Sequence, residues 1–245
     1  YTTFSGIKQT PDNEDDILIV EFDKPCSIAG IFTKSLTSSA PVNQCRSNLS
    51  SSEKSTVRAI VVNSGNANAF TGKLGEETVS KISKFLSKLL KSNINQIYTA
   101  STGVIGEQLD SNKIINSFKS MTSYNSQNWL KAANAIKTTD TFPKIAMRTC
   151  KIDNVEIEIV GIAKGSGMIA PDMATMLGFI FTNANLPSDI LQKLLKEGNE
   201  TSFNSITVDS DTSTSDTVLL AATQRAKHDL ISKYTDKRLK EFKNC

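Results

Sequence analysis

The stretch that decides how this chain folds is KGSGMIAPDMATML, residues 164–177. It leads from the end of one expected strand into a continuous apolar strand over residues 176–182. Gly165 and Gly167 permit backbone angles that other residues avoid, and Pro171 fixes one backbone angle. The sequence therefore predicts a tight loop between two strands of a sheet.

Thr175 stands where this loop meets the strand, directly after the small residue Ala174. A threonine hydroxyl is a poor nucleophile unless a base takes its proton. The chain has a single histidine, His228, which we interpret as a surface residue. A free α-amino group on Thr175 itself would have a pKa of about 7.7–8.0, which suits a general base. Self-cleavage between Ala174 and Thr175 would expose it; the alternative is a turn before a core strand, with an incidental threonine.

Hydrophobic patterns on both sides of the loop alternate between strands and helices. Strands are expected over residues 16–23, 27–33, 58–63, 96–100, 144–160 (a hairpin turning at Asp153-Asn154), 176–182 and 217–222. Helices are expected over residues 76–91, 111–121, 128–137 and 229–243, together with one that Ser188 caps. A short turn at Lys24-Pro25 and serine-rich loops over 35–39 and 47–55 complete the pattern. This mixture of hairpins and crossovers predicts an α/β layered fold with mixed sheets.

Three further segments have the composition of functional loops. Thr102 and Gly103 follow an expected strand, and a hydroxyl beside a backbone N–H is suited to an oxyanion hole, although a plain turn remains open. Residues 63–69 (NSGNANA) resemble an anion-binding turn but lack the P-loop pattern. Residues 208–216 are rich in oxygen ligands but fail the calcium-loop template. We interpret this last segment as a hydrogen-bonded loop that lines the site.

Composition argues against several classes of partner. The 28 basic and 25 acidic residues give a net charge of +3, and the lysines are scattered, so neither nucleic acid nor membrane is expected as a partner. The four cysteines show no metal-binding spacing, and the single histidine argues against a zinc site, so no metal is expected. With no secretory leader and no apolar run of membrane length, we expect a cytoplasmic protein.

The chain resembles the ornithine acetyltransferase (glutamate N-acetyltransferase) family of arginine biosynthesis. The matching motifs, in chain order, are residues 30–33 (GIFT), 40–42 (APV), 63–69 (NSGNANA), 101–106 (STGVIG), 138–141 (TTDT), the opening loop 164–177 and residues 203–209 (FNSITVD). So many motifs in one order make the resemblance specific. It implies an αββα-like layered fold with mixed sheets, similar to N-terminal-nucleophile self-processing enzymes.

The resemblance also implies roles for individual residues. Autocatalytic cleavage at Ala174–Thr175 would give an α-chain region over residues 1–174, with the oxyanion and substrate loops, and the start of a β-chain region over 175–245. Thr175 would be the nucleophile. Thr102 and Gly103 would form the oxyanion hole. Thr138, Lys164 and Thr175 would contact the substrate. Two α and two β chains would assemble as a heterotetramer.

The implied reaction is ping-pong transfer of acetyl from N2-acetyl-L-ornithine to L-glutamate through an acetyl-threonine. Acetyl-CoA is a further acetyl donor in part of the family, and no cofactor is required. The family carries further substrate-contacting residues beyond the position that matches Cys245, so we expect a fragment cut at both ends that lacks its C-terminal part. The alternatives are a self-processing aminopeptidase or amidase, in which water releases the acyl group, and an inactive truncated fragment.

Overall fold

The computed structural model describes residues 1–245 except 11, 52–54, 120–127, 169–175 and 210. Ala174 and Thr175 therefore lie outside the described residues. The strands are β1 (Thr2–Thr3), β2 (Ile17–Phe32), β3 (Thr56–Asn66), β4 (Ile97–Val104), β5 (Lys144–Ile152), β6 (Val155–Lys164), β7 (Leu177–Thr182) and β8 (Thr217–Ala222). The α-helices are α1 (Ala40–Ser50), α2 (Gly72–Leu89), α3 (Ser111–Lys119), α4 (Trp129–Ala135), α5 (Ser188–Glu200) and α6 (Lys240–Asn244). Short 3-10 helices span Ile94–Gln96, Phe203–Ser205 and Lys237–Leu239.

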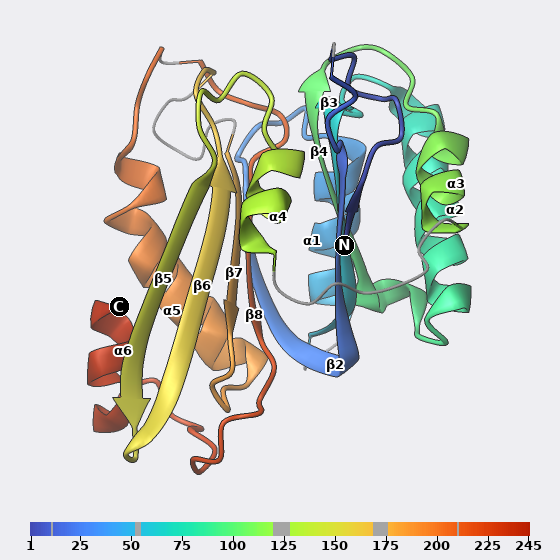
Figure 1. Ribbon diagram of the computed structural model, residues 1–245. Helices are drawn as coiled ribbons and strands as arrows, with labels where there is room; N and C mark the ends of the chain where they lie inside the picture. The colour runs from blue at the N-terminus through green and yellow to red at the C-terminus, as the bar shows by residue number, and fades with distance from the viewer. Residues whose placement is uncertain (11, 52–54, 120–127, 169–175, 210) are drawn as a thin grey trace.

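One long strand, β2, organises the sheet. Its first half pairs antiparallel with β3 and its second half pairs antiparallel with β8, with a register shift between Glu21 and Cys26. The strand order is β4-β3-β2-β8-β7-β6-β5, and β1 pairs with the start of β2. The β3–β4 and β7–β8 pairs are parallel, and the other pairs are antiparallel. The sheet is therefore mixed, and it is continuous through β2 (Figure 1).

Alternation along the strands divides the buried residues among three cores, because successive side chains point to opposite faces. On β3, Ile60 and Val62 face the central core, whereas Ala59 and Val61 face α2 and α3. On β8, Leu219 faces the central core and its neighbours face α5 and α6. The layers are thus α2 and α3, one half of the sheet, the other half, and α5 and α6 (Figure 1). The expected αββα-like layering is confirmed.

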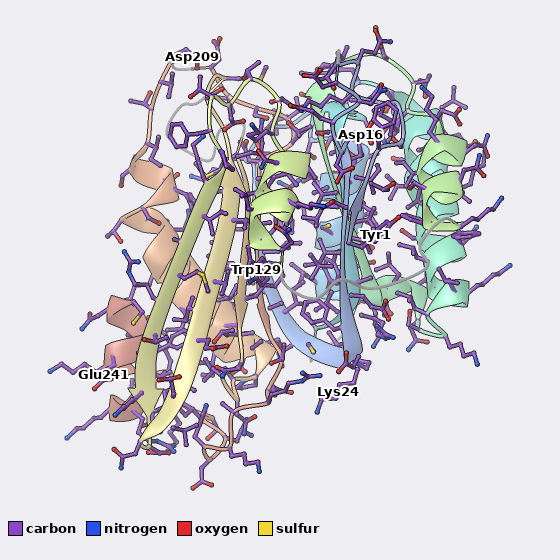
Figure 2. The ribbon with its side chains drawn as sticks, in the orientation of Figure 1. Tyr1, Asp16, Lys24, Trp129, Asp209 and Glu241 are labelled. Atoms are coloured by element: carbon purple, nitrogen blue, oxygen red, sulfur yellow. The ribbon has the colours of Figure 1, made fainter. Side chains whose placement is uncertain are left out.

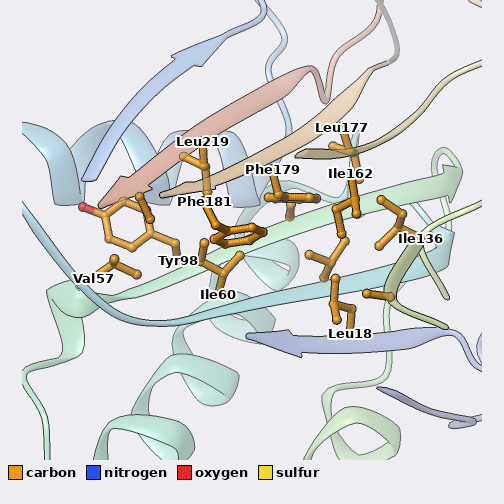
Figure 3. Packing of buried hydrophobic residues seen from close by; sticks show 14 of the residues in the cluster. Leu18, Val57, Ile60, Tyr98, Ile136, Ile162, Leu177, Phe179, Phe181 and Leu219 are labelled. Atoms are coloured by element: carbon orange, nitrogen blue, oxygen red, sulfur yellow. The ribbon is translucent and has the colours of Figure 1, made fainter. Parts of the chain in front are cut away.

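Aromatic and aliphatic side chains from both halves of the sheet meet in the central core (Figure 3). Phe181 of β7 lies 5.3 Å from the Trp129 ring of α4 and 6.2 Å from the Phe22 ring of β2, measured between ring centroids. Phe179, two residues earlier and on the same face of β7, is fully buried in the same core. The apolar run over 176–182 therefore forms the centre of the molecule, as its composition predicts.

Two predictions about the N-terminal part were wrong. The turn expected at Lys24-Pro25 does not form, because β2 stays extended through this segment and only its register shifts. The serine-rich segment 47–55 was expected to be a loop, but its first four residues lie in α1. Burial of Val42 and Cys45, with a proline in the first turn, supports this helix despite its polar composition.

The C-terminal segment also differs from expectation. An amphipathic helix was expected over 229–243, but helical structure is limited to Lys237–Leu239 and α6. Ile231, Leu239 and Phe242 are buried against the α5 side of the sheet. The apolar spacing that suggested one helix therefore comes from irregular chain that follows the surface of this core.

Two single-residue predictions were wrong as well. His228 is buried rather than exposed, and its Nε2 accepts a hydrogen bond of 2.9 Å from the Asn185 amide. Ser188 does not cap α5, since Pro187 occupies the N-cap position and no side chain caps the helix. Both predictions came from the polar character of the local sequence. Packing around the segment between β7 and α5 instead buries His228 and leaves Ser188 without a capping role.

The proposed division between residues 174 and 175 does not separate two bodies. The strands that follow it, β7 and β8, lie between β2 and β6, which precede it. β7 pairs with β6 from Leu177 to Thr182, and β8 pairs with β2 from Thr217 to Ala222. The two regions are therefore parts of one hydrogen-bonded sheet. Their description as an α-chain and a β-chain region stays a prediction.

We predict that Phe179→Ala lowers the free energy of unfolding by about 3–5 kcal/mol, because it leaves a cavity between the two halves of the sheet. Urea unfolding followed by circular dichroism measures this loss. Phe142, which is 60% exposed, provides the matched control. Phe142→Ala should cost less than about 1 kcal/mol. Equal losses in the two variants would contradict the assignment of Phe179 to the central core.

Candidate active site

A hydrogen bond joins the two halves of the sheet at one end of the molecule. Lys164 is the last residue of β6, and Thr102 lies near the end of β4. The Nζ atom of Lys164 donates to Oγ1 of Thr102 over 3.1 Å, and both side chains are buried. Lys164 also pairs in register with Leu177, the first residue of β7. The structure thus brings together two residues that are 62 positions apart in the chain and that the sequence had marked separately.

Lys164 is a buried cation, only 2% exposed. Burial lowers its pKa, and the nearby charge of Lys144 lowers it further. The carboxylates of Asp140 and Asp216 oppose this shift without cancelling it. A lysine in such surroundings is suited to contact a charged or reacting group, because perturbed side chains gather at functional sites.

Asp140 ties the TTDT segment to the turn after β6. Its Oδ1 accepts hydrogen bonds from Lys144 Nζ at 2.5 Å and from the Gly165 amide at 2.8 Å. Its Oδ2 makes a long contact of 3.5 Å with the Thr138 amide. Burial raises the pKa of Asp140, but the bonds from Lys144 and Gly165 and the charge of Lys164 outweigh it, so the pKa is lowered. The backbone of Thr138 is therefore held close to the turn that Lys164 begins.

The Thr102-Gly103 pair lies at the boundary between core and solvent. Thr102 is buried and Gly103 is exposed. Gly103 has a φ of +131°, and a Cβ atom on it would lie 2.3 Å from the carbonyl carbon of Gly65. The atoms in the way belong to the backbone and have nowhere to move, so only glycine fits this position. The close approach of β3 and β4 fixes the backbone of the expected oxyanion pair.

Side chains of residues 63–69 form hydrogen bonds that support the ends of β3 and β4. Asn63 accepts a hydrogen bond of 2.6 Å from the Ser101 hydroxyl and donates one of 2.8 Å to the Asn66 carbonyl. Asn68 donates to the Gly75 carbonyl and accepts from the Thr71 hydroxyl. These side chains are engaged in internal bonds, which favours a structural role over the anion-binding role considered from the sequence.

Two aspartates of the oxygen-rich segment 208–216 bind the backbone on the two sides of residues 169–175. Oδ2 of Asp209 accepts a hydrogen bond of 2.6 Å from the amide of Met168, the last described residue before the gap. Oδ1 of Asp216 accepts one of 2.8 Å from the amide of Met176, the first residue after it. Figure 2 shows Asp209 at the end of the molecule opposite Lys24, where β2 bends. Asp209 and Asp216 thus bind the backbone at residues 168 and 176, and the lining of an active site by this segment stays a prediction.

Sequence reasoning missed two residues of this site. Asp140 lies inside the TTDT motif, and Asp216 ends the oxygen-rich segment, but neither was given a role. Their composition alone looks like ordinary loop polarity. Their position was a signal: Asp140 lies within the TTDT motif, and Asp216 directly precedes the apolar run that forms β8.

The proposed nucleophile Thr175 and its neighbour Ala174 lie outside the described residues. Within the described part of the chain, no group of three or more histidine, cysteine, aspartate or glutamate residues is arranged to hold a metal ion. No helix in that part has the length and apolar character needed to cross a membrane.

The sequence model of the ArgJ family matches residues 1–245. The arginine biosynthesis bifunctional protein ArgJ of Bartonella henselae is 49% identical over 242 residues, which cover 98% of this chain and 58% of that protein. The ArgJ protein of Rhizobium meliloti is 49% identical and covers 96% of this chain and 56% of its own length. The chain thus spans less than two thirds of the length of these relatives.

Solved structures agree with this result. The ArgJ protein of Bacillus halodurans superimposes with a TM-score of 0.65 and 28% identity over 71% of this chain and 88% of its own. The ornithine acetyltransferase of Mycobacterium tuberculosis, solved with ornithine, gives 0.56 and 27% over 69% and 89%. An aminopeptidase of the N-terminal-nucleophile hydrolase fold from Ochrobactrum anthropi gives 0.56 at 9% identity, over 99% and 78%, which supports the fold alone. Because the family match spans all 245 residues and its relatives are about half identical, this chain belongs to the ArgJ family.

Proposed function

We propose that this chain takes part in transfer of an acetyl group from N2-acetyl-L-ornithine to L-glutamate. The observation that carries the proposal is the hydrogen bond between Lys164 and Thr102, within a member of the ArgJ family. It brings an expected substrate residue and an expected oxyanion residue to the start of β7. The likeness to an ornithine acetyltransferase solved with ornithine gives the proposal its substrate.

The first step of the proposal is self-cleavage between Ala174 and Thr175. The Thr175 hydroxyl attacks the Ala174 carbonyl, the peptide C–N bond breaks, and water hydrolyses the resulting ester to give a carboxylate on Ala174 and a free amine on Thr175. Hydrogen bonds from Met168 to Asp209 and from Met176 to Asp216 hold the chain on either side of this loop. Cleavage would leave residues 1–174 and 175–245 associated, because β7 and β8 remain paired with β6 and β2. The new amino group on Thr175 then serves as the base.

Acetyl transfer then proceeds in two half-reactions. The Thr175 amine takes the proton of its own hydroxyl while the oxygen attacks the acetyl carbonyl of N-acetylornithine. The amine returns this proton to the departing nitrogen, so ornithine leaves and an acetyl ester remains on Thr175. The amino group of glutamate attacks that ester, gives up a proton through the same base, and leaves as N-acetylglutamate. Both half-reactions pass through an oxyanion.

Lys164 gives Thr102 the orientation that an oxyanion hole needs. Because Lys164 Nζ donates to Thr102 Oγ1, the hydroxyl hydrogen of Thr102 must point away from Lys164. That hydrogen is then available to the oxyanion, beside the backbone N–H of Gly103. Removing one such donor typically lowers kcat by about 10²–10³-fold. In the proposal Lys164 and Thr138 also contact the substrate.

The remaining parts of the proposal concern donors and assembly. The reaction requires no metal or cofactor, since one nucleophile, one base and one oxyanion hole suffice for acyl transfer. Acetyl-CoA is proposed as a second acetyl donor, and curated relatives are named bifunctional.

Two α and two β chains are proposed to assemble into the heterotetramer, which sizing of the cleaved protein tests. The cytoplasmic location stays a prediction.

We predict that Thr175→Ala abolishes both cleavage and transfer, because it removes the hydroxyl that attacks in each. Thr175→Ser should keep part of both, since hydroxyl and amine survive. Intact mass measures conversion of the chain into one piece that ends at Ala174 and one that begins at Thr175, and formation of N-acetylglutamate from N-acetylornithine and glutamate measures transfer. The full gene product is used for both assays.

Thr149→Ala, an exposed threonine on the edge strand β5, is the matched control and should behave as wild type. Cleavage that persists in Thr175→Ala would refute the mechanism. Acetate release that glutamate does not suppress would favour the aminopeptidase or amidase alternative. For the 245-residue chain by itself, a single uncut mass of 26.7 kDa after prolonged incubation would favour an inactive truncated fragment.

We also predict that Thr102→Val lowers kcat for transfer by about 10²–10³-fold with little change in KM, because valine keeps the volume but lacks the hydroxyl. Thr102→Ser should lie within about tenfold of wild type. Lys164→Met should lower kcat as well, since Thr102 loses the donor that orients it. Steady-state kinetics with N-acetylornithine and glutamate measure these effects. Near-normal kcat in Thr102→Val would remove Thr102 from the oxyanion hole.

A further inference from the structure

Asp216 holds the backbone of the residue that follows the proposed nucleophile. Its side chain is fully buried, with 0% exposure, directly before β8. Its Oδ1 accepts the Met176 N–H at 2.8 Å, and the N–H of Thr217 donates to the Met176 carbonyl at 3.0 Å. Both polar groups of the Met176 backbone are therefore bound by two consecutive residues.

The second oxygen of this carboxyl is unusual. Oδ2 of Asp216 is buried and has no hydrogen-bond partner among the described residues. A buried carboxylate with one oxygen unpaired is costly, whereas a neutral carboxyl costs far less. Burial raises the pKa of Asp216 to about 8, against smaller opposing effects of the Met176 amide, the Ser213 side chain and Lys164. At pH 7 the group is therefore mostly protonated.

Few charges surround Asp216. Lys164 of β6 is the charged group that acts on it within the described chain, while the sequences of β7 and β8 contain no charged residue. Lys34, just after β2, is exposed. Asp140 and Lys144 act on Lys164 from its other side. Asp216 thus interacts with one backbone amide, the side chain of Ser213 and a single buried cationic neighbour.

We propose that Asp216 is a positioning residue of the active site, which fixes the start of β7 through the N–H of Met176. This inference rests on the proposed function, in which Thr175 is the nucleophile. One peptide bond joins Thr175 to Met176, and consecutive Cα atoms are about 3.8 Å apart. Anchoring Met176 therefore limits where the hydroxyl and the new amine of its neighbour can lie. Misplacement by about 1 Å can cost a reaction roughly 10²-fold.

The test compares two substitutions at this position in the full gene product. Asp216→Asn keeps an acceptor for the Met176 N–H and, like the protonated acid, is neutral. Asp216→Ala removes the acceptor. We expect Asp216→Asn to keep kcat within about tenfold of wild type and Asp216→Ala to lower it by about 10²-fold, with KM changed little. Asp189→Asn, at an exposed aspartate of α5, is the control and should match wild type.

Amide hydrogen exchange measures the protection of the Met176 N–H, and so tests its hydrogen bond to Asp216 independently of activity. The Met176 amide should exchange slowly in wild type and Asp216→Asn, and faster in Asp216→Ala. Should the alanine variant fail to fold, Asp216→Ser, which is too short to bond the amide, replaces it. An inactive wild type with a protected Met176 amide would refute the proposed function but support the anchor. An unprotected amide in wild type, normal kcat in Asp216→Ala, or equal losses in both variants would overturn the inference.

Stability against pH provides a second readout. The pKa of Asp216 is raised in the folded protein, so between about pH 4 and 8 the native state binds a proton that the unfolded state has lost. The contribution of Asp216 to stability therefore falls as pH rises through this window. The thermal midpoint of Asp216→Asn minus that of wild type should increase from pH 5 to pH 8. A constant difference would contradict burial of a protonated carboxyl at this position.

Discussion

The structure depends on one constraint: β2 must pair with β3 along its first half and with β8 along its second. A single extended segment of 16 residues therefore belongs to both layers of the sheet. The strand bends at the register shift between Glu21 and Cys26, and its pairing with β3 resumes at Cys26. With the two halves stacked, Phe22 and Phe181 meet in the central core and exclude water from it. Every later feature of the site relies on that stacking.

The candidate site lies at the end of the two stacked sheet halves where Lys164 contacts Thr102. It combines buried side chains with a small number of charges of opposite sign. Lys164 reaches from one half of the sheet to Thr102 on the other, so the distance between the layers sets the geometry of this pair. Burial moves the pKa of Lys164 down and that of Asp216 up, so it disfavours the charged form of each side chain. Asp140, paired with Lys144, keeps its charge instead, because its hydrogen bonds outweigh burial. Neighbouring carboxyl groups thus take different protonation states.

Much of this arrangement was accessible from the sequence, and the failures have physical causes. The hairpin at Asp153-Asn154 and the apolar run of β7 follow period-two and buried-strand patterns that local sequence determines. The helix α1 was missed because its stability comes from burying Val42 and Cys45 rather than from its polar composition. His228 was misjudged because its partner, the Asn185 amide, is 43 residues away. Contacts of that range leave no local signal.

The sequence by itself determined the family and indicated candidate residues for the site, since ordered motifs carry residue types. It could also indicate why a chain with one histidine would use a terminal amine as its base. Only the tertiary structure decided which of these residues meet. Three features require the bent sheet. They are the contact of Lys164 with Thr102, the bond of Asp216 to Met176, and the placement of β7 and β8 between β2 and β6. The physical reason is that hydrogen bonds and desolvation depend on distance in space, which local sequence patterns do not specify.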